Sequence, residues 1–321
     1  MTILVTGGAG FIGSHFVDMH LERCPEDKVV CLDKLTYAGS MDNLASALEN
    51  PNFRFVKGDI CDRELLRKLF GEVRPDKVVN FAAESHVDRS IASPQVFLET
   101  NYMGTAALLD ASLEYGVKRF HQISTDEVYG DLPLESTEKF TEKTPADPHS
   151  PYSASKAAAD MLALAYYKTY GLNVTVSRCS NNYGERQYPE KLIPLAVKKA
   201  VSGEKIPVYG DGKNVRDWIY VKDHCRAVEL ILENGRAGEI YNIGADNELS
   251  NLALIEKLTE ILETLGVKNV KTKFVPDRKG HDRRYALSAE KIRRELGFKA
   301  EADFDKKFPE AVKWFEKKFT E

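Results

Sequence analysis

The stretch Ile3-Leu4-Val5-Thr6-Gly7-Gly8-Ala9-Gly10-Phe11-Ile12-Gly13 decides the fold that we expect for this chain. A short apolar strand is followed at once by a glycine-rich turn and then by an apolar helical pattern through Phe16 and Met19. Glycine is needed where a turn is tight and where the backbone must touch a pyrophosphate, and the helix behind the turn offers unpaired N–H groups to an anion. The glycine pattern alone is weak evidence, but strand, turn and helix come here in the required order. We therefore predict a dinucleotide-binding site at residues 3–13.

A second apolar strand, residues 29–32, ends in Asp33, twenty positions after Gly13. A carboxylate at this place accepts hydrogen bonds from a ribose hydroxyl and repels a 2′-phosphate. Asp33 therefore favours NAD over NADP as the cofactor. A helix cap is the alternative explanation of this residue.

Strands and helices alternate through the rest of the first half. Residues 53–56, 77–81, 119–123 and 174–177 have the apolar composition of buried strands, and a long helix is expected from residue 94 to residue 115. Such alternation implies a parallel sheet with right-handed crossovers. The predicted fold class is therefore α/β, with a doubly wound parallel Rossmann sheet.

The second half of the chain is interpreted as a smaller C-terminal α/β lobe that is interleaved with this sheet. We expect helices at 250–265, 288–296 and 308–319, and strands at 218–221 and 240–243 that complete the Rossmann sheet. The predicted NAD-binding domain covers residues 1–178, with its sheet completed by strands within about 214–245. Residues 179–321 form mainly the nucleotide-sugar-binding lobe, although no Gly/Ser-rich linker marks the boundary.

The composition is that of an ordinary globular protein. Of the 321 residues, 43% are hydrophobic and 29% are charged, with a formal net charge of −4. No basic run suggests nucleic acid, the chain starts in a strand without a signal peptide, and no apolar run approaches the length of a membrane span. The five cysteines are scattered without CxxC spacing, which favours reduced thiols over disulfides or zinc. We expect a cytoplasmic protein that binds no nucleic acid, no membrane and no metal ion.

Tyr152 and Lys156 are the first candidates for chemistry. Ser150 and Pro151 suit the cap and the first position of a helix, and Tyr152 and Lys156, four residues apart, share one face of that helix. A cation beside a phenol favours the phenolate, so we expect a lowered pKa for Tyr152, which makes it a plausible base for a substrate hydroxyl. This pair is common by chance, but it gains weight here from the dinucleotide fingerprint and from Ser124 upstream.

Asp126 and Glu127 are the second candidates. They follow the apolar strand of residues 119–123, and the binding crevices of open α/β sheets lie at the carboxyl ends of the strands. Two neighbouring carboxyl groups can divide the roles of acid and base if their surroundings push their pKa values apart. An isolated Asp-Glu pair is more often a solvated turn, so the neighbouring motifs decide in favour of a site.

Matching segments that run nearly end to end show that the chain resembles the extended short-chain dehydrogenase/reductase family and, more narrowly, the family of dTDP-glucose 4,6-dehydratases. These segments are residues 7–13, 33–39, 82–90, 124–130, 152–156, 181–184, 189–194, 216–218 and 277–285. Related epimerases share the glycines and the Tyr/Lys pair but carry small hydroxyl residues where this chain has Asp126 and Glu127. One departure is Glu185-Arg186, where a proline and an aromatic residue are more usual, and it concerns the shape of a local loop.

The resemblance implies dehydration of dTDP-glucose to dTDP-4-keto-6-deoxyglucose. NAD⁺ would take hydride from C4 of the hexose while Tyr152, assisted by Lys156, takes the hydroxyl proton. Water would then be eliminated across C5 and C6, and hydride would return to C6. The resemblance implies Asp126 as the acid and Glu127 as the base, a division that the sequence alone does not decide. Thr125 would hydrogen-bond the C4 oxygen, and capping of a turn is an equally good explanation of that side chain.

The motifs and the resemblance together assign residues to the cofactor and to the substrate. The expected NAD-binding residues are Gly7, Gly10, Phe11, Ile12, Gly13, Asp33, Lys34, Thr36, Asp59, Ile60, Ala82, Ala83, Ser85, Thr100, Tyr152, Lys156 and Asn182. The expected substrate-binding residues are Ser85, His86, Thr125, Asp126, Glu127, Asn181, Lys191, Leu192, Pro207, Tyr209, Arg216, Asn251, Arg278 and His281. Arg216 is expected to bind phosphate, with a pair to Asp217 as the alternative, and a solvated surface is the alternative for the charged run at 277–284.

Three other functions stay open from the sequence. The same dehydration of a UDP-sugar is the first, because recognition of the base rests on few contacts. A nucleotide-sugar 4-epimerase is disfavoured by Asp126 and Glu127. A non-catalytic NAD-binding regulator predicts loss of Tyr152, Lys156 or the acidic pair, and all of them are present. The resemblance further implies a homodimer through helices near 94–115 and 152–170, for which packing within one chain is the alternative.

Overall fold

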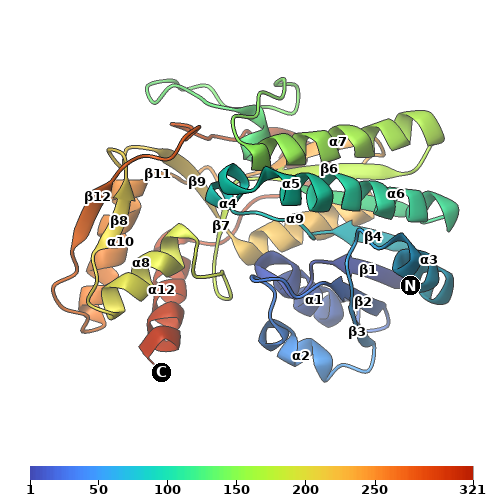
Figure 1. Ribbon diagram of the computed structural model, residues 1–321, viewed down its shortest axis with the longest axis horizontal. Coiled ribbons are helices and arrows are strands. Elements are labelled where there is room, and N and C mark those ends of the chain that lie inside the picture. The colour runs from blue at the N-terminus through green and yellow to red at the C-terminus, as the bar shows by residue number, and fades with distance from the viewer. Residues whose placement is uncertain (321) are drawn as a thin grey trace.

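The computed structural model describes residues 1–320 and contains a central seven-stranded parallel sheet (Figure 1). Its strands are β1 (Thr2–Thr6), β2 (Lys28–Asp33), β3 (Phe53–Lys57), β4 (Lys77–Asn80), β5 (Arg119–Thr125), β6 (Val174–Cys179) and β10 (Glu239–Ile243). In space they follow the order β10-β6-β5-β4-β1-β2-β3. The predicted doubly wound Rossmann sheet is confirmed. The order reverses between β1 and β4, which is where sheets of this kind bind ligands.

Helices cover both faces of this sheet because its strands are apolar on both sides. The main helices are α1 (Phe11–Arg23), α3 (Arg63–Val73), α5 (Pro94–Phe97), α6 (Thr105–Glu114), α7 (Pro151–Tyr170) and α9 (Val221–Asn234). Ile3 and Val5 of β1 belong to one core with α1 and α9, whereas Leu4 between them belongs to a second core with α3, α6 and α7. Figure 1 shows α5, α6 and α7 along one face and α1 and α9 along the other.

The helix expected from residue 94 to residue 115 is interrupted by a wider turn. Between α5 and α6 the backbone of η2 (Leu98–Gly104) has π-helical winding. Asn101, within this segment, accepts a hydrogen bond from the Glu84 N–H at 2.8 Å and donates to Ser155 Oγ of α7 at 2.9 Å. Such π segments are often found at functional sites. Here the segment fixes the loop after β4 against α7.

Most of the rest of the chain forms a smaller lobe, seen on the left of Figure 1. It contains a three-stranded sheet, a parallel strand pair and three helices. These elements are β7 (Asn181–Tyr183), β8 (Ile206–Tyr209), β9 (Val215–Tyr220), β11 (Glu248–Ser250), β12 (Thr272–Val275), α8 (Leu192–Val201), α10 (Asn251–Thr264) and α12 (Phe304–Thr320). Helix α11 (Glu290–Leu296) instead contacts β10 and α9, beside the main sheet. The short elements η1 (Met41–Leu44), α2 (Ala45–Leu48) and α4 (Val87–Ala92) lie in the first half.

One of the two strands expected to complete the Rossmann sheet is placed elsewhere. β10 pairs with β6 at the edge of the main sheet, as predicted for residues 240–243. The prediction for residues 218–221 is wrong, because β9 pairs with β7 and β11 in the separate sheet. The apolar pattern of a strand does not show which other strand it pairs with, so the sequence contained no signal that β9 joins the separate sheet. The division of the chain at residue 178 stays a prediction.

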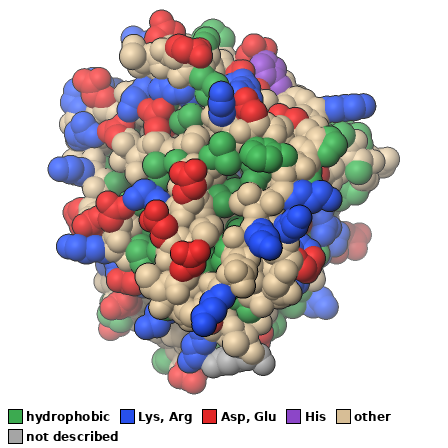
Figure 2. Space-filling model, turned by 90° about the vertical axis from the view of Figure 1, so that its left-hand side faces the viewer, with side chains coloured by type: hydrophobic (Ala, Val, Ile, Leu, Met, Phe, Trp, Pro, Cys, Tyr) green, Lys and Arg blue, Asp and Glu red, His purple; other side chains and the backbone are tan. Residues whose placement is uncertain are grey.

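The surface of the smaller lobe carries both signs of charge. Figure 2 views the molecule from the left-hand side of Figure 1, and basic and acidic side chains are interspersed over that face. All five cysteines are free thiols. Within residues 1–320, every helix is too short or too polar to cross a lipid bilayer.

Candidate active site

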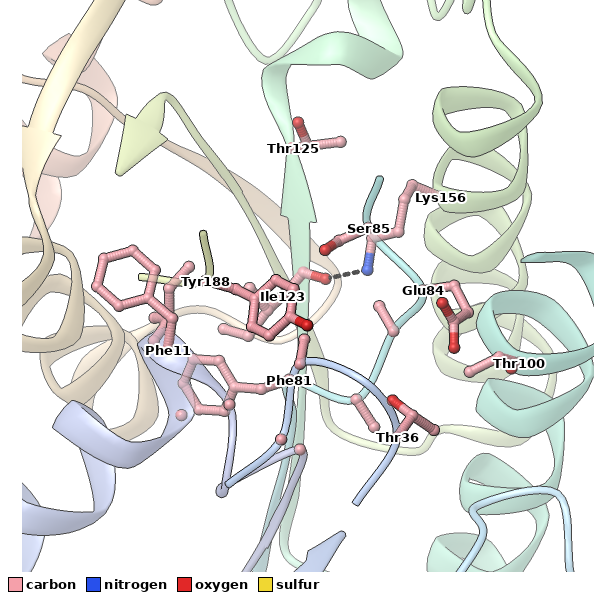
Figure 3. Close-up of a pocket in the computed structure, with 18 of the residues that line it drawn as sticks. Phe11, Thr36, Phe81, Glu84, Ser85, Thr100, Ile123, Thr125, Lys156 and Tyr188 are labelled. Carbon is pink, nitrogen blue, oxygen red and sulfur yellow. Dashed lines mark hydrogen bonds between the residues drawn. The ribbon is translucent and has the colours of Figure 1, made fainter. Parts of the chain in front are cut away.

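A pocket of about 310 Å³ lies at the carboxyl ends of the central strands, where the strand order reverses. The structure brings all the predicted NAD-binding residues to its wall, from Gly7 in the first turn to Asn182 in β7. Figure 3 shows Phe11, Phe81 and Tyr188 on one side of this pocket and Glu84 and Thr100 on the other. The pocket is therefore continuous from the glycine turn to the end of β5.

The glycines of the first turn are required by close contacts between backbone segments. A Cβ atom on Gly7, whose φ is +69°, would lie 2.5 Å from the Ala82 nitrogen. A Cβ atom on Gly13 would lie 2.4 Å from the Gly7 carbonyl oxygen and 2.9 Å from the Gly8 Cα. The turn thus packs directly against the loop after β4 and against the first turn of α1. This arrangement leaves the start of α1 open to an anion, as the sequence predicts.

Asp33 stands at the end of β2 rather than at a helix cap. Its carboxylate accepts hydrogen bonds from the Ala9 N–H at 2.9 Å and the Leu35 N–H at 2.8 Å. Burial raises the pKa of Asp33, and these two hydrogen bonds oppose that shift. Next to it, Lys34 pairs with Asp59 at 2.6 Å. The place where the sequence predicts a ribose is thus lined by two acids, Asp33 and Asp59, and one amine, Lys34.

Tyr152 and Lys156 project from the first turns of α7. Ser150 and Ser153 form a reciprocal capping box at the start of this helix, as the Ser-Pro pair predicted. Lys156 Nζ donates a hydrogen bond to the Ile123 carbonyl oxygen at 2.6 Å, the dashed line in Figure 3. Both side chains are buried and line the pocket.

The expected lowering of the Tyr152 pKa is not found. Burial is the largest cause and raises the pKa of this phenol well above its usual range, and the nearby Glu127 carboxylate raises it further. A hydrogen bond with Thr125 acts in the opposite direction. The prediction from the Tyr/Lys spacing is wrong in this respect because burial has the largest effect on the pKa of this phenol, while Lys156 donates its hydrogen bond to the backbone of β5.

Asp126 and Glu127 lie in the short helical turn η3 (Asp126–Tyr129) that follows β5. Thr125 caps this turn: its Oγ1 accepts a hydrogen bond from the Glu127 N–H and donates one to Asp126 Oδ1, each at 3.2 Å. Capping, the alternative explanation of Thr125, is therefore observed. Asp126 Oδ2 is buried and has no hydrogen-bond partner among residues 1–320.

The two carboxyl groups have different electrostatic surroundings. Burial raises the pKa of Asp126 well above its usual range, and the carboxylates of Glu127 and Asp217 add to that shift. Burial also raises the pKa of Glu127, but Arg278, Lys191 and Arg216 each act to lower it. Three cations act to lower the pKa of Glu127, whereas Arg216 is the one cation that acts in this direction on Asp126. The surroundings therefore favour a protonated Asp126 beside a more readily ionised Glu127.

The predicted substrate residues divide into two groups. Ser85, Thr125, Asp126, Glu127, Asn181 and Lys191 line the pocket, where Lys191 Nζ donates to the Ser85 carbonyl oxygen at 2.7 Å. The others lie outside its wall: His86, Leu192, Pro207, Tyr209, Arg216, Asn251, Arg278 and His281. His86 caps α4, Leu192 and Asn251 begin α8 and α10, and Pro207 lies in β8.

Two of the outer residues, Arg216 and Arg278, lie close enough to Glu127 to act on its charge. The Tyr209 ring meets His281 edge-on, and His281 pairs with Asp277 at 2.5 Å. Arg216 is buried, stacks 4.0 Å over the Tyr285 ring and donates to the Asp282 carbonyl oxygen at 2.9 Å. The pair with Asp217, the alternative for Arg216, is not formed, because Asp217 accepts backbone hydrogen bonds.

Some pocket residues were missed by the sequence analysis. They are Phe81, Glu84, Gln187, Tyr188 and Glu190, together with Cys179 and Ser180 at the end of β6. Glu84 and Glu190 lie inside segments that matched the family, but their side chains gave no chemical signal of their own. Only the fold brings the 187–190 loop across to β1 and β4.

Asp160 was also missed, although its position four residues after Lys156 indicates that both side chains share one face of α7. It lies four residues after Lys156 on α7, is fully buried, and accepts hydrogen bonds from Ser124 Oγ at 2.9 Å and Arg178 Nε at 3.0 Å. Burial lowers the pKa of Lys156, and the charge of Asp160 opposes that shift. Asp160 therefore favours the ammonium form of Lys156 and joins α7 to β5 and β6.

A glycine turn, a Tyr/Lys pair and two adjacent carboxyl groups thus share one pocket. Residues 4–310 match the family described as GDP-mannose 4,6 dehydratase. The chain belongs to this family. The predicted resemblance is confirmed by a dTDP-glucose 4,6-dehydratase from an Actinoplanes species, which is 51% identical over 320 residues that cover 98% of both chains.

Two further family relatives are similarly close. The low-salt glycan biosynthesis protein Agl12 of Haloferax volcanii is 53% identical over 305 residues, or 95% of each chain. The crystal structure of DesIV, a dTDP-glucose 4,6-dehydratase from Streptomyces venezuelae with NAD and TYD bound, has a TM-score of 0.93 and 49% identity. That comparison covers 99% of this chain and 97% of DesIV, so the fold is shared across both lobes.

Proposed function

We propose that this protein is an NAD-dependent nucleotide-sugar 4,6-dehydratase, a lyase that converts dTDP-glucose into dTDP-4-keto-6-deoxyglucose. The observation that carries the proposal is the position of Asp126 and Glu127 beside Tyr152, in the same pocket as the glycine turn. Relatives with about half of their residues identical to this chain, which bear the name dTDP-glucose 4,6-dehydratase, support the same substrate.

The pocket fits NAD. The Gly7 and Gly13 positions leave no room for a Cβ atom, so the backbone can approach a pyrophosphate, and Asp33 stands where a ribose hydroxyl is expected. NAD in the crystal structure of DesIV supports the same cofactor here. The glycine turn and Asp33 would hold NAD, which when bound would supply the acceptor for the C4 hydride of the hexose and the donor for its return to C6.

Tyr152 is the proposed base for the C4 hydroxyl. Its raised pKa means that it keeps its proton until positive charge enters the pocket beside it. Lys156 is held at the Ile123 carbonyl, and Asp160 favours its charged form against the effect of burial, so it is proposed to contribute positive charge from the same helix face. Thr125, besides capping its turn, is proposed to hydrogen-bond the C4 oxygen.

Asp126 and Glu127 then remove water across C5 and C6. The 4-ketone makes the C5 proton acidic, and Glu127, surrounded by Arg278, Lys191 and Arg216, is the proposed base that takes it. Asp126, whose raised pKa keeps it protonated, is the proposed acid for the departing C6 hydroxyl. The surroundings thus favour the division of roles that the sequence alone left open.

The diphosphate end of the substrate is proposed to lie toward the smaller lobe. Lys191, Arg216 and Arg278 all act on the Glu127 carboxylate, so their positive charges converge on one region. Arg278 Nε is buried without a hydrogen-bond partner among residues 1–320, so a donor is available there. We propose that Asn181, His86, Leu192, Pro207, Tyr209, Asn251 and His281 complete this half of the site.

The UDP-sugar alternative is tested directly by supplying purified protein with dTDP-glucose and UDP-glucose in separate reactions. Mass analysis should show the loss of one water from dTDP-glucose. Loss of water from UDP-glucose alone would move the proposal to the alternative substrate. An isomer of unchanged mass would point to an epimerase.

The cofactor is regenerated in every turnover, so it should stay bound through purification. Protein denatured after gel filtration should release close to one NAD per chain. A chain with bound NAD that converts neither sugar would support a regulatory function, and a chain stripped of NAD by gel filtration would contradict internal recycling.

We further propose that the protein works as a homodimer in the cytoplasm. Val96, Leu98, Met103 and Met161 are exposed on α5, η2 and α7, the helices that the family resemblance pairs across a dimer. Five free thiols fit a reducing compartment.

A further inference from the structure

A cluster of metal-ligand side chains lies at the far end of α1 from the glycine turn. His20 is in the last turn of this helix, Cys24 is its C-terminal cap, and Asp27 is in the turn that leads to β2. The Nε2 or Nδ1 of His20, the Cys24 Sγ and an Asp27 carboxylate oxygen all lie within 4.8 Å of one another. These residues belong to neither the cofactor half nor the substrate half of the pocket.

The orientation of His20 is fixed by a buried carboxylate. His20 Nδ1 lies 2.7 Å from Glu229 Oε1 of α9, and both side chains are 2% exposed. An imidazole that donates from Nδ1 to a carboxylate presents the lone pair of Nε2 on its opposite edge. A carboxylate behind a histidine is the arrangement that orients histidine ligands in metal sites.

The opposite edge of His20 has no ordinary hydrogen-bond partner. Nε2 is buried and unpartnered among residues 1–320, and its nearest acidic atom is Asp27 Oδ2 at 3.4 Å. The other oxygen, Oδ1, is held by the amino group of Met1 at 2.7 Å. An imidazole lone pair and a carboxylate oxygen repel each other unless a cation lies between them. That cation is either a proton on Nε2 or a metal ion.

We propose that His20, Cys24 and Asp27 bind one divalent transition-metal ion of the Zn²⁺ class. Nitrogen, sulfur and oxygen ligands in this number suit tetrahedral zinc with water in the fourth position. The Cys24 thiol loses its proton to solvent as the Sγ–metal bond forms, so the site carries one thiolate, one carboxylate and one neutral imidazole.

No metal site is expected from the sequence, because the cysteines lack CxxC spacing. This set is instead built from one helix turn, His20 to Cys24, and from a carboxylate three residues further on. The ion joins the end of α1 to the turn before β2, and Glu229 extends the link to α9. Its role is structural, and it is independent of the proposed dehydration.

Cobalt provides the test, because a thiolate bound to Co²⁺ gives a charge-transfer band that an ion bound only to oxygen does not give. Titration of metal-free, full-length protein with Co²⁺ should give this band with one ion per chain, and Zn²⁺ should remove it. Cys24→Ser should abolish the band, whereas Cys61→Ser, which changes another partly exposed cysteine, should keep it. Glu229→Gln should weaken Co²⁺ binding about 10- to 100-fold.

A second measurement needs no variant. X-ray absorption of the zinc-loaded wild-type protein should show one sulfur ligand among nitrogen and oxygen ligands, and Zn²⁺ should raise the Tm of the wild-type protein. No charge-transfer band in the wild type, or a band that survives Cys24→Ser, would overturn the proposal. In the first case a proton alone bridges His20 and Asp27.

Discussion

Asp126 and Glu127 are neighbours in the chain, yet the fold gives them different environments. Asp126 is 2% exposed and receives repulsion from Glu127 and Asp217. Glu127 faces three cationic side chains. Two carboxyl groups with such surroundings titrate as a coupled pair, with one proton held more tightly than the other.

This difference predicts a bell-shaped pH profile for elimination. A base is active when ionised, so the rate should fall as pH drops through the pKa of Glu127, which burial raises above its usual value. An acid is active when protonated, so the rate should fall again as pH rises through the raised pKa of Asp126. Glu127→Gln and Asp126→Asn should each slow elimination by about 100- to 10,000-fold. Mass analysis of product at each pH measures the rates.

The variants also separate the two steps. Glu127→Gln should still reduce part of its bound NAD when substrate is added, seen as NADH absorbance, because C4 oxidation precedes proton removal at C5. Glu135→Gln makes the same chemical change at an exposed position outside the pocket and should leave the rate within about twofold. Normal turnover of Glu127→Gln would remove this residue from the proposed role.

For individual residues, the sequence predicts well which side chains lie together in the pocket. It predicts less well which hydrogen bonds they form and how their pKa values shift. The spacing of Tyr152 and Lys156 correctly places both side chains in the pocket. It does not reveal that Lys156 is held by the Ile123 carbonyl, because a backbone acceptor has no residue-type signal. Burial likewise reverses the expected direction of the Tyr152 pKa.

At the scale of the elements, the turn between β1 and α1 is the one whose sequence is most constrained by close backbone contacts. Gly13→Ala would place a Cβ atom 2.4 Å from the Gly7 carbonyl oxygen and 2.9 Å from the Gly8 Cα. Both of these atoms belong to the backbone, so the turn itself would have to move. We expect a loss of about 1–3 kcal/mol in the free energy of unfolding and loss of NAD retention. Urea unfolding and the NAD content of purified protein measure these effects.

Gly71 provides a matched control in the interior of α3. A Cβ there would lie 3.6 Å from the Tyr115 ring, an ordinary contact. Gly71→Ala should therefore stabilise the protein by about 0.5–1 kcal/mol and leave NAD retention unchanged. Equal effects of the two substitutions would show that the turn tolerates a side chain.

The elements themselves were largely predictable, and their partners were not. Ser150 and Ser250 both cap the helices that they were expected to begin, because capping is a local interaction. β9 and β10 have similar apolar patterns, yet only β10 joins the main sheet. The π-helical winding of η2 depends on contacts of Asn101 with Glu84 and Ser155, which lie far away in sequence.

At the scale of the whole molecule, the exposed apolar side chains of η2 and α7 predict the surface through which two chains form the proposed homodimer. Met161 is 58% exposed on α7, next to η2. Met161→Glu would bury an unpaired charge in the proposed interface and should convert the dimer into a monomer, measured by analytical ultracentrifugation. Leu48→Glu adds the same charge at a similarly exposed apolar residue on α2 and should leave the dimer intact. A monomeric wild-type protein, or a Met161→Glu dimer, would contradict this interface.

The position of β10 governs how this chain is made. β6 ends at Cys179, but its outer edge is paired only when Glu239 and the residues after it arrive. At about 5–20 residues per second, a ribosome needs on the order of 3 to 12 s to add the intervening segment. During that interval the nascent chain presents an open strand edge, the feature through which unfinished chains aggregate. The synthesis of residues 180–239 is therefore the interval in which the edge of β6 lacks its partner strand.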